Sequence, residues 1–197
     1  MSSTYQLTLS PKTLESAEPK AKSVLAKAQS QVGFIPNMYA VMANSPALLE
    51  TYLDGYARFR AESGFTTAEQ EVVFLTISRE NRCHYCMAAH STLADTQSNV
   101  PVEVTNAIRD GCAILDAKLA ALSVFTRVMV DKRGLPTQEE VEAFLDAGYT
   151  ERHILDIVLA IAVKTLSNYS NHLFDTPVDE VFSGRVWAQG LKENDAP

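Results

Sequence analysis

Apolar residues recur at helical spacing along most of this chain, and the segments they form are short and bounded by clear end signals. Thr67-Ala-Glu-Gln70 and Thr137-Gln-Glu-Glu140 match the capping-box pattern, in which two side chains satisfy free backbone amides at a helix start. Gly64, Gly134 and Gly148 fall where such segments are expected to end. No pair of alternating segments is joined by a turn, so β-hairpins are not expected. The pattern predicts an all-α fold, a bundle of eight or nine helices.

The expected helices cover residues 19–31, 38–42, 46–63, 68–80, 82–94, 101–110, 117–132, 138–147 and a longest one from 151 onward. The apolar face expected on the longest helix comprises Ile154, Ile157, Val158, Ile161, Ala162, Thr165, Leu166 and Tyr169. Cys86-x-x-x-His90 lines up with Asn168-x-x-x-His172, and Glu71 with His153, which raises the alternative of a degenerate internal helical-hairpin repeat.

We expect residues 1–19 to form an extended lead-in, residues 20–190 a single all-helical domain and residues 191–197 a polar tail. Lys and Arg number 17 against 24 Asp and Glu, which leaves a net charge of -7. Such a chain lacks the positive field that binds nucleic acids and anionic membranes, so neither is an expected partner. No signal peptide and no run of about 18 apolar residues is found, so the expected location is the cytoplasm.

Two of the three cysteines stand three residues apart, in Cys83-His84-Tyr85-Cys86. On a helix, Cys83, Cys86 and His90 share one face, with His90 one turn beyond Cys86. An imidazole at that spacing can take the thiol proton, and the thiolate is the form that attacks. Glu71 lies on the preceding expected helix, and a tight link through residues 80–82 would fold the two helices antiparallel. A carboxylate from one helix would then meet the histidine or the thiol of the other.

Other interpretations of these residues remain open. A CxxC pair is also half of many zinc sites, but structural zinc usually needs a second pair, and the sequence has no second CxxC or HxxxH. A redox- or metal-sensing module without turnover is the alternative from a different functional class. Cys112 is expected to be a small buried core residue and His172 part of a buried hydrogen-bond network or a subunit contact, whereas Trp187 is a candidate for docking on a neighbouring subunit.

The combined pattern Glu71-x(11)-Cys83-x-x-Cys86-x(3)-His90 resembles the signature of the AhpD-like alkylhydroperoxidases within the carboxymuconolactone decarboxylase family. The resemblance extends through NRCHYCMAAHS, the upstream GFIPNMYAVMANSPALLETYL and NYSNHLFDTPVD near the carboxyl end, and spans most of residues 20–180. It implies an AhpD-like helical fold, assembly as a homotrimer or homohexamer, and an oxidoreductase without a cofactor or metal. A lactone decarboxylase, the other activity of the family, is the enzymatic alternative.

By the same resemblance, Cys86 is the peroxidatic cysteine, Cys83 the thiol that resolves it as a disulfide, and Glu71 with His90 the proton relay. The substrate is a hydroperoxide, and an external thiol reductant, such as a lipoylated or thioredoxin-like protein, completes the cycle. The sequence departs from the AhpD pattern at Tyr85, where that branch carries a histidine. A tyrosine does not act as a base at neutral pH, so this part of the relay is missing.

Overall fold

The computed structural model describes residues 4–188, which form nine α-helices and one 3-10 helix and contain no strand. The all-α prediction with eight or nine helices is therefore confirmed. The helices are α1 (Pro19–Val32), α2 (Asn37–Met42), α3 (Pro46–Glu62), α4 (Thr67–Glu80), α5 (His84–Thr96), α6 (Val102–Asp110), α7 (Ala117–Asp131), α8 (Gln138–Asp146), α9 (Glu151–Phe174) and η1 (Glu180–Arg185).

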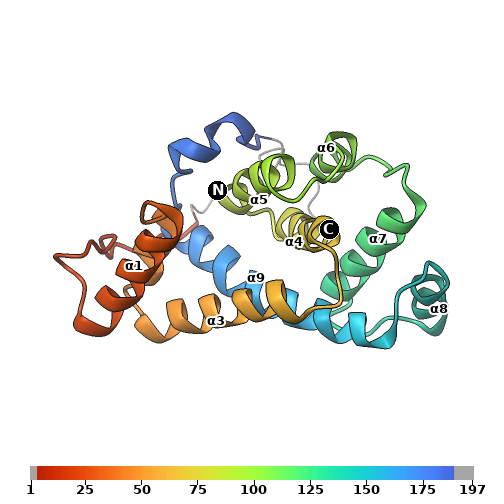
Figure 1. Ribbon diagram of the computed structural model, residues 1–197, viewed down its shortest axis with the longest axis horizontal. Helices are drawn as coiled ribbons and strands as arrows, with labels where there is room; N and C mark the ends of the chain where they lie inside the picture. Colours follow the sequence, from red (N-terminus) through yellow and green to blue (C-terminus); the bar gives the residue numbers. More distant parts are fainter. Residues whose placement is uncertain (1–3, 189–197) are drawn as a thin grey trace.

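The α4–α5 hairpin lies at the centre of the molecule, with α3 and α9 crossing one side of it, α6 and α7 on another and η1 beside α5 (Figure 1). Helix α4 is buried continuously from Glu69 to Ser78 because α5, α6, α7 and α9 all pack against it. A helix enclosed in this way usually carries apolar residues on all sides. The acidic residues of α4 are therefore exceptions that need partners, and Glu71 is one of them.

Most helix ends follow the sequence signals. Thr137 and Glu140 form the predicted capping box, and Asp116 caps α7. The start of α4 differs by one residue: Thr66, not Thr67, is the N-cap, and its partner is Glu69. Either threonine suits the position, but only Thr66 has a residue three positions later that carries a carboxylate.

The face predicted for the longest helix was only partly correct: Ile157 is buried, and Ile154, Ile161 and Leu166 pack against the core, but the most buried residues of the helix follow a different line. Helix α9 buries Ile157, Ala160, Val163, Lys164, Ser167, Asn168, Ser170 and Asn171, whereas Val158 and Tyr169 are exposed. The hydrophobic pattern placed the polar residues outside, but the structure turns them toward the cysteines. The proposed hairpin repeat is not formed either, because α9 runs without a break through the residues that align with the α4–α5 turn.

Residues 4–18 contain no helix and pack along the domain, with the backbone amide of Leu7 bonded to the carbonyl of Leu173 at 2.7 Å and that of Lys12 to Ala40 at 2.8 Å. The expected polar tail, residues 191–197, lies outside the described residues. Between residues 4 and 188, no helix has both the length and the apolar composition needed to cross a bilayer.

Candidate active site

The two cysteines lie where α4 turns into α5. Arg82 adopts a left-handed conformation with φ of 56°, which reverses the chain, and the amide of Cys83 bonds back to the carbonyl of Ser78 at 2.9 Å. Cys83 is the N-cap of α5, and Cys86 follows in the first turn. The unpaired amides and the dipole at a helix start favour negative charge there, so the fold places both sulfurs where a thiolate is stabilised.

Both sulfurs are buried and share a hydrogen-bond donor. The Nδ2 atom of Asn171 lies 3.3 Å from the Sγ of Cys86 and 3.8 Å from the Sγ of Cys83. Burial alone raises the pKa of the Cys86 thiol, but the hydrogen bond from the Cys83 thiol and the positive charge of Lys164 outweigh it and bring that pKa well below its usual value. Burial and the adjacent Cys86 sulfur raise the pKa of Cys83. Of the two sulfurs, Cys86 is therefore the one whose surroundings favour the thiolate, with the Cys83 thiol as a donor to it.

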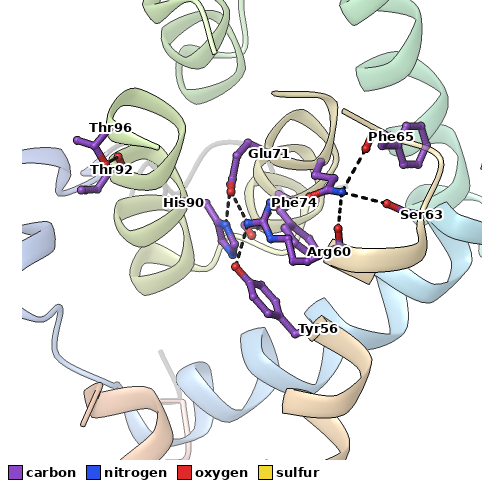
Figure 2. Close-up of polar contacts among 11 residues, drawn as sticks. Tyr56, Arg60, Ser63, Phe65, Glu71, Phe74, His90, Thr92 and Thr96 are labelled. Carbon is purple, nitrogen blue, oxygen red and sulfur yellow. Dashed lines mark hydrogen bonds and ion pairs between the residues drawn. The ribbon is translucent and has the colours of Figure 1, made fainter. Parts of the chain in front are cut away.

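The His90 ring is held by a buried carboxylate. Its Nδ1 lies 2.8 Å from Glu71 Oε2, while the other oxygen of Glu71 accepts from the Arg60 guanidinium (Figure 2). Burial raises the pKa of Glu71, but His90 and Arg60 lower it below its usual value overall. The carboxylate is thus ionised and accepts the Nδ1 proton, which leaves Nε2 as the basic atom of the ring. Burial, and then the charge of Lys164, lower the pKa of His90, so the imidazole is neutral at pH 7.

A small cavity of about 80 Å³ lies beside Cys86. Its lining residues come from α2, α3, α5, α9 and η1 and include Cys86, His90 and Lys164. The remaining walls are mostly aromatic and apolar: Pro36, Met38, Tyr39, Tyr52, Tyr56, Tyr85, Ala89, Leu93 and Phe182. A larger hollow of about 570 Å³ between α7 and α9 includes neither thiol nor any histidine among its lining residues. The chemistry of the chain is therefore concentrated at the smaller cavity.

The structure brings the four predicted site residues together: Cys83, Cys86 and His90 along α5, and Glu71 across from them on α4. Their burial is nearly complete, with Glu71 and Cys83 each 0% exposed. This juxtaposition is the one that a proton relay requires. The catalytic roles of the four residues remain predictions.

Two predictions about other residues were wrong, and a third was wrong in part. Cys112 is exposed, because Gly111 ends α6 in a left-handed turn and Cys112 follows it outward. His172 is exposed and stacks on Tyr169 instead of joining a buried network, while the alternative of a subunit contact stays a prediction. Trp187 is buried within its own chain, where its ring packs on His84 and its Nε1 donates to the carbonyl of Arg109 at 3.0 Å.

Sequence reasoning missed three polar residues of the site. Arg60 neutralises Glu71, Lys164 supplies positive charge to the cavity, and Asn171 donates hydrogen bonds to the two sulfurs. A usable signal was the single lysine in the apolar run ILDIVLAIAVKTLS, since a lysine is rarely buried without a partner.

Tyr85, which stands where the AhpD pattern has histidine, donates its hydroxyl proton to Asp179. It therefore anchors the segment before η1, and burial raises its pKa further from any role as a base.

Metal binding finds little support in this arrangement. Among the described residues, no three or more His, Cys, Asp or Glu side chains group in a way that could hold an ion. The polar groups around the Cys86 sulfur include the amide of Asn171, the hydroxyl of Ser167 and the ammonium of Lys164, none of which is a usual zinc ligand.

The chain matches no family model and no curated protein. Solved structures do share its fold. A peroxidase-related protein with an alkylhydroperoxidase AhpD core from Ralstonia eutropha JMP134 has a TM-score of 0.77 at 20% identity, covering 91% of this chain and 97% of that one. A peroxidase-related protein from Silicibacter sp. TM1040 has a TM-score of 0.72 at 19% identity, covering 92% and 98%.

A cysteine-to-alanine variant of the debrominase Bmp8, in complex with 2,3,4-tribromopyrrole, also has a TM-score of 0.72, at 17% identity and with 91% and 96% of the two chains covered. At these identities the comparisons establish architecture. The resemblance noted in the sequence is confirmed at that level: the chain has the all-α fold of the AhpD-like, peroxidase-related proteins.

Proposed function

We propose that this chain is a thiol-dependent peroxidase of the AhpD-like type, which reduces a hydroperoxide at Cys86. The observation that carries the proposal is the environment of the Cys86 sulfur. It borders a cavity, accepts hydrogen bonds from Cys83 and Asn171, and lies in the positive field of Lys164. These features stabilise a thiolate at neutral pH, and a thiolate that a small substrate can reach is the nucleophile that peroxide reduction needs.

The reaction takes two steps on the protein. The Cys86 thiolate attacks the terminal oxygen of the hydroperoxide, an S–O bond forms, the O–O bond breaks, and the alkoxide takes up a proton to leave as an alcohol. Sulfur is oxidised by two electrons to sulfenic acid, and the peroxide is reduced by two. The Cys83 sulfur then attacks the sulfenic sulfur, and the Cys83 proton leaves with the displaced hydroxide as water, so that a disulfide remains.

His90 and Glu71 prepare the nucleophile in this scheme. The Nε2 atom of His90 takes the Cys86 proton and passes it to solvent before the peroxide reacts, so the ring is neutral again when the O–O bond breaks. Glu71 fixes the ring in the tautomer that keeps Nε2 free. Arg60 holds the Glu71 carboxylate in its ionised form, so Glu71 orients the imidazole and does not exchange the proton itself. An external dithiol, such as a lipoylated or thioredoxin-like protein, would return the disulfide to two thiols.

Multiple turnover with a dithiol tests the proposal. Purified protein, cumene hydroperoxide or hydrogen peroxide, and dihydrolipoamide are mixed, and the loss of peroxide is followed. We expect catalytic consumption by the wild type and by Cys112→Ser, a control that removes only the exposed thiol. Cys86→Ser should show none. Steady turnover by Cys86→Ser would refute the proposal, and a single oxidation without turnover would favour a sensor. Lactone decarboxylation that survives thiol alkylation would favour the other family activity.

Reductive debromination is a second candidate, suggested by the aromatic wall of the cavity and by the shared fold with Bmp8. In that reaction a bromopyrrole gains hydrogen and loses bromide, while the two thiols supply two electrons and become a disulfide. The cavity volume favours a small peroxide such as hydrogen peroxide, because about 80 Å³ holds only a few water-sized groups, whereas cumene hydroperoxide and tribromopyrrole both require the lining side chains to move. Release of bromide from 2,3,4-tribromopyrrole at a rate above that of peroxide consumption would reverse this order.

A further inference from the structure

Lys164 is an unusual residue to find in the core of this protein. It lies in the middle of α9, it is 1% exposed, and within residues 4–188 its Nζ has no oxygen or nitrogen as a hydrogen-bond partner. No carboxylate in that part of the chain forms an ion pair with it, since the nearby Glu71 is occupied by Arg60 and His90. The side chain lines the same cavity as Cys86 and His90.

A buried ammonium without an anion is unfavourable, because the charge has lost its hydration and gained little in return. The Phe74 ring, with its centroid 5.5 Å from Nζ, compensates part of the charge. The Cys86 thiolate compensates another part, since Lys164 lowers the pKa of that thiol. The Cys86 sulfur is at most the acceptor for one N–H group of the ammonium, and no oxygen or nitrogen of the described residues accepts from the others, which suits a group whose partner is the oxygen of a bound ligand.

The other polar groups of the cavity are poorly placed to give up a proton. The proton on His90 Nδ1 is bonded to Glu71, and Nε2 is unprotonated in the neutral ring. Tyr85 donates to Asp179. Burial raises the pKa of Tyr39, of Tyr52 and of Tyr56, because each would become a phenolate in an apolar site. The Lys164 ammonium, in contrast, carries protons that no oxygen or nitrogen of the described residues accepts.

We propose that Lys164 is a catalytic residue of the peroxidase reaction: its Nζ binds the inner oxygen of the hydroperoxide and donates the proton that this oxygen needs to leave. The proposal rests on the function proposed above. As Cys86 sulfur bonds to the terminal oxygen, the electron pair of the O–O bond moves to the inner oxygen. Lys164 transfers a proton to it, so that a thiolate, a hydroperoxide and an ammonium become a sulfenic acid, an alcohol and a neutral amine. Solvent then restores the ammonium.

This assignment predicts a dependence on the leaving group. An alkoxide is a poor leaving group and needs a proton, whereas the carboxylate released from a peracid is stable at neutral pH and needs none. Lys164→Met keeps the length of the side chain and removes both charge and proton. The reduced variant is mixed with cumene hydroperoxide or with peracetic acid, and the rate of Cys86 oxidation is measured in a single turnover. Each rate is then divided by the fraction of Cys86 present as thiolate, which is taken from the pH dependence of its alkylation.

We expect the normalised rate of Lys164→Met to fall by a factor on the order of 10²–10⁴ with cumene hydroperoxide and by less than about tenfold with peracetic acid. Lys132→Met, which removes a surface lysine paired with Glu140, should match the wild type with both oxidants. Lys164→Gln, which keeps hydrogen-bond donors but no acidic proton, should show the same selective loss and serves if Lys164→Met does not fold.

Equal losses with the two oxidants would overturn the proposal, because Lys164 would then act only on the thiolate. Wild-type protein that reacts with neither oxidant would instead refute the peroxidase function itself. The two failures are therefore distinguishable.

Discussion

Replacing Glu71 by Gln removes one negative charge from the centre of the site while keeping the shape of the side chain. Glu71 is 0% exposed, and its two oxygens bond to Arg60 and to His90 Nδ1. The substitution breaks a buried ion pair, which costs about 3–5 kcal/mol when one partner is neutralised. Arg60 keeps the Tyr56 hydroxyl at 2.9 Å and the Gln70 side-chain oxygen at 3.1 Å. We therefore expect a loss of about 3 kcal/mol, near the lower end of that range.

The loss is measured by urea unfolding. With a denaturant slope of about 2 kcal/mol/M, the midpoint should fall by about 1.5 M. The variant should also oxidise slowly at Cys86, because an amide can donate to His90 Nδ1 and so place the ring proton on Nε2, where the base is needed. Loss of a general base lowers rates by about 10²–10⁴-fold. Stopped-flow oxidation by cumene hydroperoxide below the unfolding midpoint measures this effect separately from stability.

Glu69→Gln is the matched control. Glu69 is also buried and lies two residues earlier on the same helix, but its carboxylate bonds to Thr66, Tyr149 and Lys118. This variant should lose stability through those contacts and keep the wild-type rate of Cys86 oxidation. A folded Glu71→Gln protein that oxidises as fast as the wild type would show that the carboxylate serves the fold alone.

Three further outcomes are expected. Cys83→Ser should consume one equivalent of peroxide and stop as sulfenic acid at Cys86, seen by mass spectrometry; continued turnover with dithiol would remove the resolving role of Cys83. Alkylation followed against pH should give Cys86 a midpoint below the usual thiol pKa of about 8.5, and Asn171→Leu should raise it by about one unit, since a hydrogen bond to a charged group contributes about 1.5–3 kcal/mol. An unchanged midpoint in Asn171→Leu would contradict the bond. Because the pKa of His90 is lowered in the folded protein, His90 is protonated at a higher pH in the unfolded chain than in the folded one, so the free energy of unfolding should fall as pH drops below about 6.5. The lowered pKa of Glu71 adds a second decrease below about 4.5 for the same reason. Urea midpoints that stay constant from pH 7 to pH 4 would contradict both.

The predicted roles of the external reductant and of a trimer or hexamer concern partners of this chain, and they remain predictions. The reductant can be approached with the disulfide form and dihydrolipoamide or a thioredoxin as alternative probes. Light scattering of the purified protein measures the assembly directly.

The sequence alone determined the features that depend on near neighbours in the chain. Capping signals such as Thr137 with Glu140 located helix starts, because the hydrogen bonds they make are three residues apart. The spacing of Cys86 and His90 predicted that both lie on one face of a helix, because residues four positions apart are about one helical turn apart. The short link before Cys83 also predicted that Glu71 would meet His90, since two helices joined so closely must pack side by side.

Only the tertiary structure decided which polar side chains enter the core from distant parts of the chain. Lys164 and Asn171 approach the cysteines because α9 crosses the α4–α5 hairpin, and Arg60 reaches Glu71 from α3. Hydrophobic periodicity assigns such residues to the surface, since a buried charge or amide is unfavourable on its own. Here the thiolate, the carboxylate and the cavity supply what each polar group lacks, and that compensation exists only once the helices have packed.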